Sequence, residues 1–179
     1  NPKKDGLCQS IIDAVKAGAS EGGAEVDEIR LCSFKLTSCR VCGNGWGTCR
    51  DSNYCTYGKD GFDEIKARIK SSDAIVIATP VYWGETSEAL KNFIDRLRRC
   101  DFRSGKVLRD KQVLIIASAG GTGNGLLTCL EQVERFCRHT GAIIFDYIGV
   151  NRWNSDYKRV AAKSAAYAMA TGRKNGQTI

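Results

Sequence analysis

The chain has 179 residues, of which 42% are hydrophobic and 26% charged, and its formal net charge is +7. This composition is typical of a globular domain with a core of ordinary size, and it argues against a disordered or fibrous chain. The longest apolar runs fall well short of a membrane span, the N-terminus shows no signal-peptide pattern, and no contiguous basic face carries aromatics, so we expect neither membrane nor nucleic-acid binding.

Hydrophobic periodicity predicts that helices and strands alternate along the chain. In order, we expect a helix around 11–15, a weak strand at 24–31, a helix around 62–69, a strand at 73–79, a helix around 90–97, a strand at 112–118, a helix around 126–137, a strand at 142–150 and a helix around 157–168. The last three strands are continuous apolar runs, typical of strands buried on both faces of a parallel sheet. We therefore expect one α/β domain over 1–179 with a doubly wound sheet.

The pattern begins with a loop and a helix instead of a strand. Because a doubly wound domain of this kind begins with a central strand, we expect such a strand upstream of Asn1. Together with the weak strand at 24–31, it would complete a parallel sheet of five strands.

Three loops are expected at the carboxyl edge of this sheet, where open α/β sheets bind their ligands. Residues 1–8 combine lysines and a glycine before a helix N-terminus, a suitable place for a phosphate group. Residues 79–87 contribute Tyr82 and Trp83, and residues 118–125 are rich in glycine. The three loops together predict a flat, phosphorylated ligand.

Two motifs resemble those of a known family. Residues 1–6 (NPKKDG) resemble the end of the phosphate loop G-S-P-R-K-N-G of NAD(P)H-dependent FMN reductases and iron–sulfur flavoproteins. Residues 79–84 (TPVYWG) and 91–96 (KNFIDR) resemble the family signature T-P-V-Y-W-G…K-x-F-I-D-R. The resemblance implies a flavodoxin-like fold, bound FMN, NAD(P)H as co-substrate, and a homodimer or homotetramer.

The resemblance also implies where FMN would lie. Its phosphate would bind the first loop, its ring would lie against residues 79–84, and its polar edge would meet residues 118–122. The implied contacts are Asn1, Lys3, Asp5, Leu7, Cys8, Pro80, Val81, Tyr82, Trp83, Gly84, Ser87, Ser118, Ala119, Gly120, Gly121 and Thr122. The family usually has Ser, Asn and Thr where this chain has Asn1, Leu7 and Cys8, so backbone amides and Lys3 would have to contribute more to phosphate binding. No catalytic side chain is expected, because the redox chemistry belongs to the cofactor.

A basic cluster is formed by Arg96, Arg98, Arg99 and Arg103, which we interpret as a solvated helix face. In the resemblance, the pair Asp95 and Arg96 is structural or lies at a subunit contact.

The chain contains nine cysteines, a high and odd number. Without an export signal, reduced thiols in the cytoplasm are expected. Those in or beside apolar segments are interpreted as small buried hydrophobic residues: Cys32, Cys100, Cys129 and Cys137.

A cysteine-rich loop at about 32–58 contains Cys39, Cys42, Cys49 and Cys55 with the spacing C-x2-C-x6-C-x5-C. Four thiolates could hold a [4Fe–4S] cluster or a tetrahedral Zn²⁺ ion. The third alternative is that the four cysteines are reduced thiols that bind no metal. Iron–sulfur flavoproteins carry a cysteine cluster at this place, with a motif near C-x2-C-x2-C followed by a fourth cysteine. Here Gly45 stands at the third position, Cys49 matches the last cysteine and Cys55 is extra. The set still totals four, so the resemblance favours the iron–sulfur cluster.

The resemblance implies two FMN-dependent functions. One is an NAD(P)H-driven reductase of a flavin or quinone, and the other is an iron–sulfur flavoprotein that exchanges electrons with an acidic carrier such as ferredoxin. The net positive charge suits either partner. The alternative is a non-enzymatic redox- or metal-sensing module on the same fold.

Overall fold

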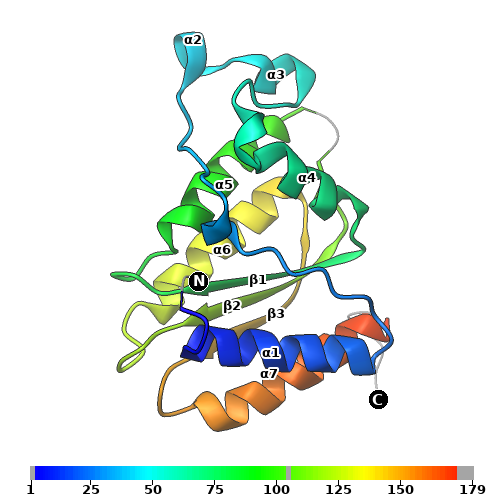
Figure 1. Ribbon diagram of the computed structural model, residues 1–179, viewed down its shortest axis with the longest axis vertical. Helices are drawn as coiled ribbons and strands as arrows, with labels where there is room; N and C mark the ends of the chain where they lie inside the picture. The colour runs from blue at the N-terminus through cyan, green and yellow to red at the C-terminus, as the bar shows by residue number, and fades with distance from the viewer. Residues whose placement is uncertain (1–2, 104–105, 173–179) are drawn as a thin grey trace.

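The computed structural model describes residues 3–103 and 106–172, so the predicted site residue Asn1 lies outside the described residues. Three strands are flanked by helices (Figure 1). In chain order the elements are α1 (Leu7–Glu21), η1 (Leu31–Ser33), α2 (Cys42–Gly45), α3 (Thr48–Ser52), η2 (Gly58–Asp60), α4 (Phe62–Ser71), β1 (Ala74–Pro80), α5 (Glu88–Cys100), β2 (Gln112–Ser118), α6 (Leu126–Thr140), β3 (Ile143–Val150) and α7 (Ser155–Ala170). The five long helices and the three strong strands predicted from periodicity are confirmed.

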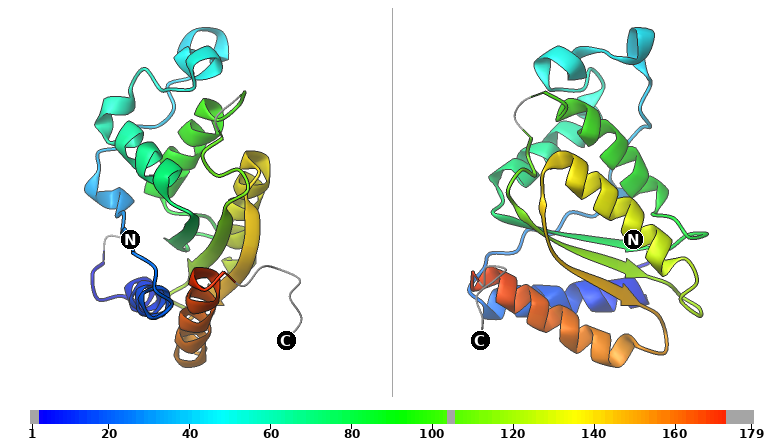
Figure 2. Two further views of the ribbon diagram at one scale, coloured as in Figure 1. Left: turned by 90° about the vertical axis from the view of Figure 1, so that its right-hand side faces the viewer. Right: turned by 180° about the vertical axis from the view of Figure 1, so that it is seen from behind.

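The strands form a parallel sheet in the order β1-β2-β3, between two layers of helices (Figure 2). Val113 and Ile115 of β2 pack into the core made with α4, α5 and α6. Leu114 and Ile116 point to the opposite face, where they pack with α1 and α7. All four side chains are fully buried, which explains why this strand is a continuous apolar run.

Sequence signals at the helix ends are also visible in the structure. Ser87 caps α5 by accepting a hydrogen bond from the Leu90 amide at 3.4 Å. Helix α6 ends at Gly141, whose φ of 77° favours glycine at a helix C-terminus. Within the described ranges, no helix has both the length and the apolar character needed to cross a bilayer.

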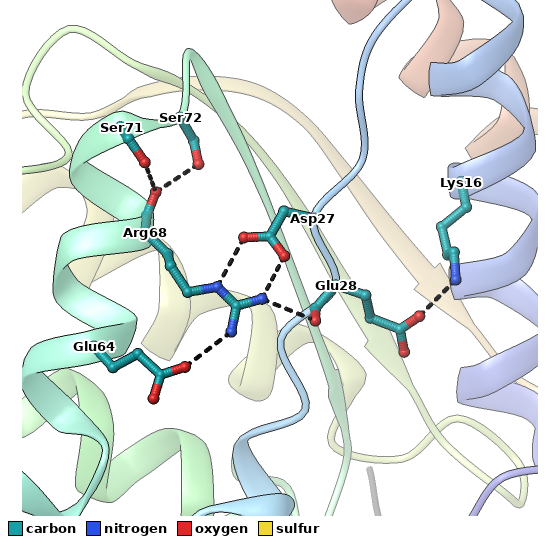
Figure 3. Close-up of polar contacts among 7 residues, drawn as sticks. All are labelled: Lys16, Asp27, Glu28, Glu64, Arg68, Ser71 and Ser72. Carbon is teal, nitrogen blue, oxygen red and sulfur yellow. Dashed lines mark hydrogen bonds and ion pairs between the residues drawn. The ribbon is translucent and has the colours of Figure 1, made fainter.

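The weak strand predicted at 24–31 is wrong. This segment is an extended coil followed by the turn η1, and it joins no strand among the described residues. Figure 3 shows what holds it: Arg68 of α4 donates hydrogen bonds to the Asp27 carboxylate and to the Glu28 carbonyl. Lys16 of α1 pairs with the Glu28 carboxylate at 2.7 Å. Side chains of the flanking helices therefore hold in place a segment that makes no β-sheet hydrogen bonds in the described structure.

The failure of this prediction has a physical reason. A strand requires a neighbouring strand to satisfy its backbone groups. In the described residues β1 pairs with β2 alone, and its Ile75, Val76 and Ile77 are only half-buried. The described sheet therefore has three strands, and the five predicted strands are not confirmed.

Candidate functional site

The carboxyl ends of all three strands meet at one edge of the sheet, beside the N-terminus of α1 (Figure 1). Pro80 at the end of β1 is opposite Ser118 at the end of β2, and Ser118 is opposite Val150 at the end of β3. The loops that follow these strands lie together, so the loops predicted at this edge do come together in space.

The loop after β1 contains a tight two-residue turn. Tyr82 and Glu85 exchange backbone hydrogen bonds of 2.9 and 3.0 Å across it. The central residues Trp83 and Gly84 both have positive φ angles, of 53° and 83°, as in a type I′ turn. Tryptophan rarely adopts this conformation, and residues held in such strain cluster at functional sites. The turn leaves the Trp83 side chain completely exposed.

An open cleft of about 480 Å³ lies between this turn and the loop after β2. That volume is in the range of small-molecule and cofactor sites. Its lining includes seven predicted contacts: Val81, Trp83, Gly84, Ala119, Gly120, Gly121 and Thr122. It also includes three residues that the sequence analysis did not single out as contacts: Gly123, Asn124 and Gly125.

Gly84 and Gly125 hold the two loops against each other. A Cβ atom on Gly125 would lie 2.4 Å from the Gly84 Cα atom, and the Gly125 φ angle is +82°. The Thr128 hydroxyl donates a hydrogen bond of 2.7 Å to the Gly84 carbonyl. Glycine at position 125 is therefore required by both conformation and space.

Side chains of the loop after β3 hydrogen-bond the backbone of the glycine-rich loop. Arg152 donates two hydrogen bonds, of 3.1 and 2.9 Å, to the Gly120 carbonyl. Asn151 donates one of 3.4 Å to the Thr122 carbonyl. Sequence reasoning missed both residues, although their position just after a predicted strand placed them at the ligand-binding edge.

The remaining predicted contacts that the structure describes do not line the cleft. Lys3 and Asp5 are exposed, with their charged groups 3.9 Å apart, and Ser87 serves as the cap of α5. The others are Leu7, Cys8, Pro80, Tyr82 and Ser118. They surround the N-terminus of α1 or lie in the strand ends and the turn beside the cleft.

The N-terminus of α1 has the properties of an anion site. Its N-cap, Gly6, provides no side-chain hydrogen bond, and its first turn contains no acidic residue. The free backbone N–H groups and the helix dipole therefore favour a negative group there.

Two buried side chains lie beneath this edge. Burial raises the pKa of the Cys8 thiol, against a smaller opposing effect of the Ser118 hydroxyl. Ser118 Oγ is buried without a well-aligned hydrogen-bond partner among the described residues. A buried hydroxyl in this state has hydrogen-bonding capacity left for a ligand.

The four motif cysteines line a second pocket, beside the last turns of α5. A fifth thiol, Cys100, lines it as well, and burial raises the pKa of Cys100 to about 12. The enclosed space is about 20 Å³, room for about one water molecule. In the described part of the chain, no three Cys, His, Asp or Glu side chains form a group that could hold a single metal ion.

Cys100, Cys129 and Cys137 are buried, as predicted. Cys32 is exposed, which corrects its interpretation as a buried residue. It lies in η1, which continues the coil where a strand was expected.

Arg96 is buried beside the cysteine pocket, with 2% of its surface exposed. Its two Nη atoms contact the Asp60 carboxylate at 2.7 and 3.1 Å. They also donate to the backbone carbonyls of Thr37 at 3.2 Å and Tyr57 at 2.9 Å. Arg96 is thus structural, as the resemblance implied, and joins both ends of the cysteine-rich loop; its interpretation as part of a solvated helix face is wrong.

Asp60 is held ionised by these contacts. Burial favours its neutral form, but hydrogen bonds from Arg96 and from the Thr37 amide and hydroxyl outweigh burial and lower the pKa of Asp60 to about 2. The Arg96 guanidinium lies 4.4 Å from the centre of the Phe62 ring, which adds a cation–π contact.

Helix α5 connects the two pockets. Ser87 caps its start beside the first cleft, and Cys100 ends it at the cysteine pocket. Thirteen helical residues span about 20 Å, so the pockets lie at opposite ends of one rigid element.

Comparison with known proteins agrees with this architecture. An iron-sulfur flavoprotein from Methanosarcina thermophila is 29% identical over 160 residues, which cover 86% of this chain and 79% of that protein. A flavone reductase structure superposes with a TM-score of 0.72 at 16% identity, over 98% of this chain and 61% of that chain. An archaeal flavodoxin superposes with a TM-score of 0.60 at 13% identity, over 94% of this chain and 91% of that chain.

The structural matches show that the fold is flavodoxin-like. The family model described as NADPH-dependent FMN reductase matches residues 1–155, most of the chain. The chain therefore belongs to the NADPH-dependent FMN reductase family.

Proposed function

We propose that the cleft of about 480 Å³ holds the flavin ring of FMN and that the N-terminus of α1 holds its phosphate. The observation that carries this proposal is the pair of interlocked loops, in which a strained Trp83-Gly84 turn faces a glycine-rich loop at the strand ends. When bound, FMN accepts a hydride and passes electrons on singly or in pairs.

The residues of the chain bind and orient the cofactor. Backbone amides at Leu7 and Cys8, with Lys3 nearby, would bind the phosphate; Asn1 is a further proposed contact. The buried Ser118 hydroxyl, which lacks a well-aligned partner in the described residues, would meet the polar edge of the ring. The Trp83 indole would cover one ring face and exclude water from it.

NAD(P)H is the proposed hydride donor, with a flavin or quinone as acceptor. Trp83, which lines the cleft, is completely exposed, and Leu127, two residues after the cleft residue Gly125, is 81% exposed. Exposed apolar side chains beside a cofactor favour cover by another protein surface, so we propose a homodimer or homotetramer. We propose a cytoplasmic setting, in which the nine cysteines would stay reduced.

We further propose that Cys39, Cys42, Cys49 and Cys55 hold a [4Fe–4S] cluster. The donor set fits in its chemistry, since four thiols surround one pocket that no carboxylate lines. A single tetrahedral Zn²⁺ with bonds of about 2.3 Å would hold sulfurs about 3.8 Å apart, whereas a cluster spreads its ligands further. Because no group of three Cys, His, Asp or Glu side chains in the described residues could hold a metal ion as it stands, the proposed cluster rests on the resemblance and on the four thiols of the pocket. Because the pocket has room for about one water molecule, the loop must open to admit it.

FMN titration of paired variants tests the cleft. A side chain at Gly121 would meet no atom within 4 Å at its Cβ, so Gly121→Ala and Gly121→Asp should both fold. We expect Gly121→Ala to bind FMN like the wild type and Gly121→Asp to bind it at least tenfold more weakly, because a carboxylate enters the cleft. Equal affinity of all three proteins would place FMN elsewhere, and no affinity in any of them would favour the sensing module.

A further inference from the structure

The cysteine pocket is lined by cations. Arg40, Arg96 and Arg99 contribute to its walls, together with Cys100 and the four motif cysteines, and no Asp or Glu does. Of the three, Arg96 is buried, Arg99 is half-buried and Arg40 is exposed. The buried Arg96 charge, although paired with Asp60, stabilises nearby negative charge more strongly than an exposed charge would, because the effective dielectric constant is low. The pocket is therefore suited to a group that becomes more negative during its function.

Arg96 is the cation that reaches a motif cysteine. Its Nη2 atom donates a hydrogen bond of 3.5 Å to Cys55 Sγ. In contrast, the Arg99 guanidinium is directed to the Gly45 carbonyl and the Trp46 ring. Arg40 lies over the Tyr57 ring, at 4.1 Å from its centre.

The position of Arg96 does not depend on the part of the loop that must open. Its anchors are Thr37, Tyr57 and Asp60, which precede and follow the segment from Cys39 to Cys55. Because Tyr57 is two residues from Cys55, the same anchors keep this sulfur within reach. None of these anchors lies in the segment between Cys39 and Cys49.

We propose that Arg96 is a positioning residue that sets the reduction potential of the [4Fe–4S] cluster through its hydrogen bond to the Cys55 sulfur, an inference that rests on the proposed cluster. The electron comes from reduced FMN or from a one-electron carrier, and reduction adds one negative charge to the cluster and its thiolates. The fixed guanidinium stabilises the reduced form more than the oxidised form. Hydrogen bonds to cluster sulfurs are a recognised determinant of such potentials.

The test is a potentiometric titration of the reconstituted full chain, followed by the electron paramagnetic resonance signal of the reduced cluster. The variants are Arg96→Gln, which removes the charge, and Arg96→Lys, which keeps the charge but loses the planar fork. Arg98→Gln is the matched control, because Arg98 lies on the same helix, is exposed and does not line the pocket. Iron content is measured for every protein.

We expect Arg96→Gln to make reduction at least tenfold less favourable, which for one electron lowers the midpoint potential by about 59 mV or more. Arg96→Lys should restore part of this loss, and Arg98→Gln should match the wild type. If Arg96→Gln assembles no cluster, Arg96→Lys decides, and a lowered potential in that variant supports the proposal.

An unchanged potential in an iron-loaded Arg96 variant overturns the inference while the cluster itself stands. A shift of the same size in Arg98→Gln also overturns it, because it reduces the effect to net charge. A wild-type protein that takes up no iron and sulfide removes the proposed cluster and this inference together, and leaves FMN binding as a separate question.

Discussion

Replacing Asp60 by asparagine removes the carboxylate that neutralises the buried Arg96 guanidinium. Arg96 would keep its hydrogen bonds to the Thr37 and Tyr57 carbonyls. Its positive charge would lose the one carboxylate that pairs with it among the described residues. Breaking a buried ion pair from one side typically costs about 3–5 kcal/mol.

The size of this effect can be worked out from the Asp60 carboxyl, whose side chain is 16% exposed. Its pKa falls from 3.8 to about 2, and at about 1.4 kcal/mol per pKa unit this corresponds to about 2 kcal/mol. Because asparagine still provides one acceptor oxygen, we expect Asp60→Asn to lower the free energy of unfolding by about 2–3 kcal/mol at pH 7.

The pH dependence gives the prediction its sign. The pKa of Asp60 is depressed in the folded state, so its contribution is complete above about pH 4 and is lost as the pH falls towards 2. Urea unfolding followed by circular dichroism at pH 7 and pH 3 measures the difference between wild type and variant, which should shrink at pH 3. Asp95→Asn is the control, since its exposed pair with Lys91 should contribute less than about 0.5 kcal/mol. A difference at pH 7 below about 0.5 kcal/mol, or one that is equal at both pH values, would refute the reasoning.

Three further substitutions test the packing and the cleft. Gly125→Ala should weaken FMN binding at least tenfold in a fluorescence titration, because its Cβ would overlap Gly84; wild-type affinity would contradict the interlocked loops. Ser118→Ala should leave the unfolding free energy of the flavin-free protein within about 1 kcal/mol of the wild type and weaken FMN binding, and the reverse pattern would show that this hydroxyl serves the fold alone. Gly18→Ala places a Cβ 2.0 Å from the Lys163 carbonyl oxygen between α1 and α7, so the free energy of unfolding should fall by about 1–3 kcal/mol, measured as a lower urea midpoint. An unchanged midpoint would mean that the helices separate freely.

The strands that could be predicted are those whose apolar residues match the burial of each strand face. The run from Val113 to Ile116 is apolar at every position because each residue faces one of two helix layers. Residues 24–31 are not buried between two helix layers in this way. Val26 is 37% exposed, and Asp27 pairs with Arg68 of α4, 41 residues away in sequence. A strand assignment there depended on a neighbouring strand, which is a tertiary property.

The cleft at the strand ends was largely predictable because the strand-end rule and the family motif indicate the same loops. The cysteine pocket was predictable only in its four motif residues. Cys100 follows Cys55 by 45 residues and lies in an amphipathic helix, so its sequence context indicates a core residue. Arg96 could not be told from its exposed neighbour Arg98, because the burial of Arg96 depends on the carboxylate of Asp60, 36 residues away in sequence.

The measurement that tests the central claim most directly is the visible spectrum of anaerobically purified protein, with FMN, iron and zinc quantified in the same sample. We predict a flavin spectrum with one FMN per chain, and the proposed cluster adds about four irons per chain. FMN without iron would retain the flavin-dependent oxidoreductase and remove the cluster. A colourless protein that does not take up added FMN would contradict the account at its centre.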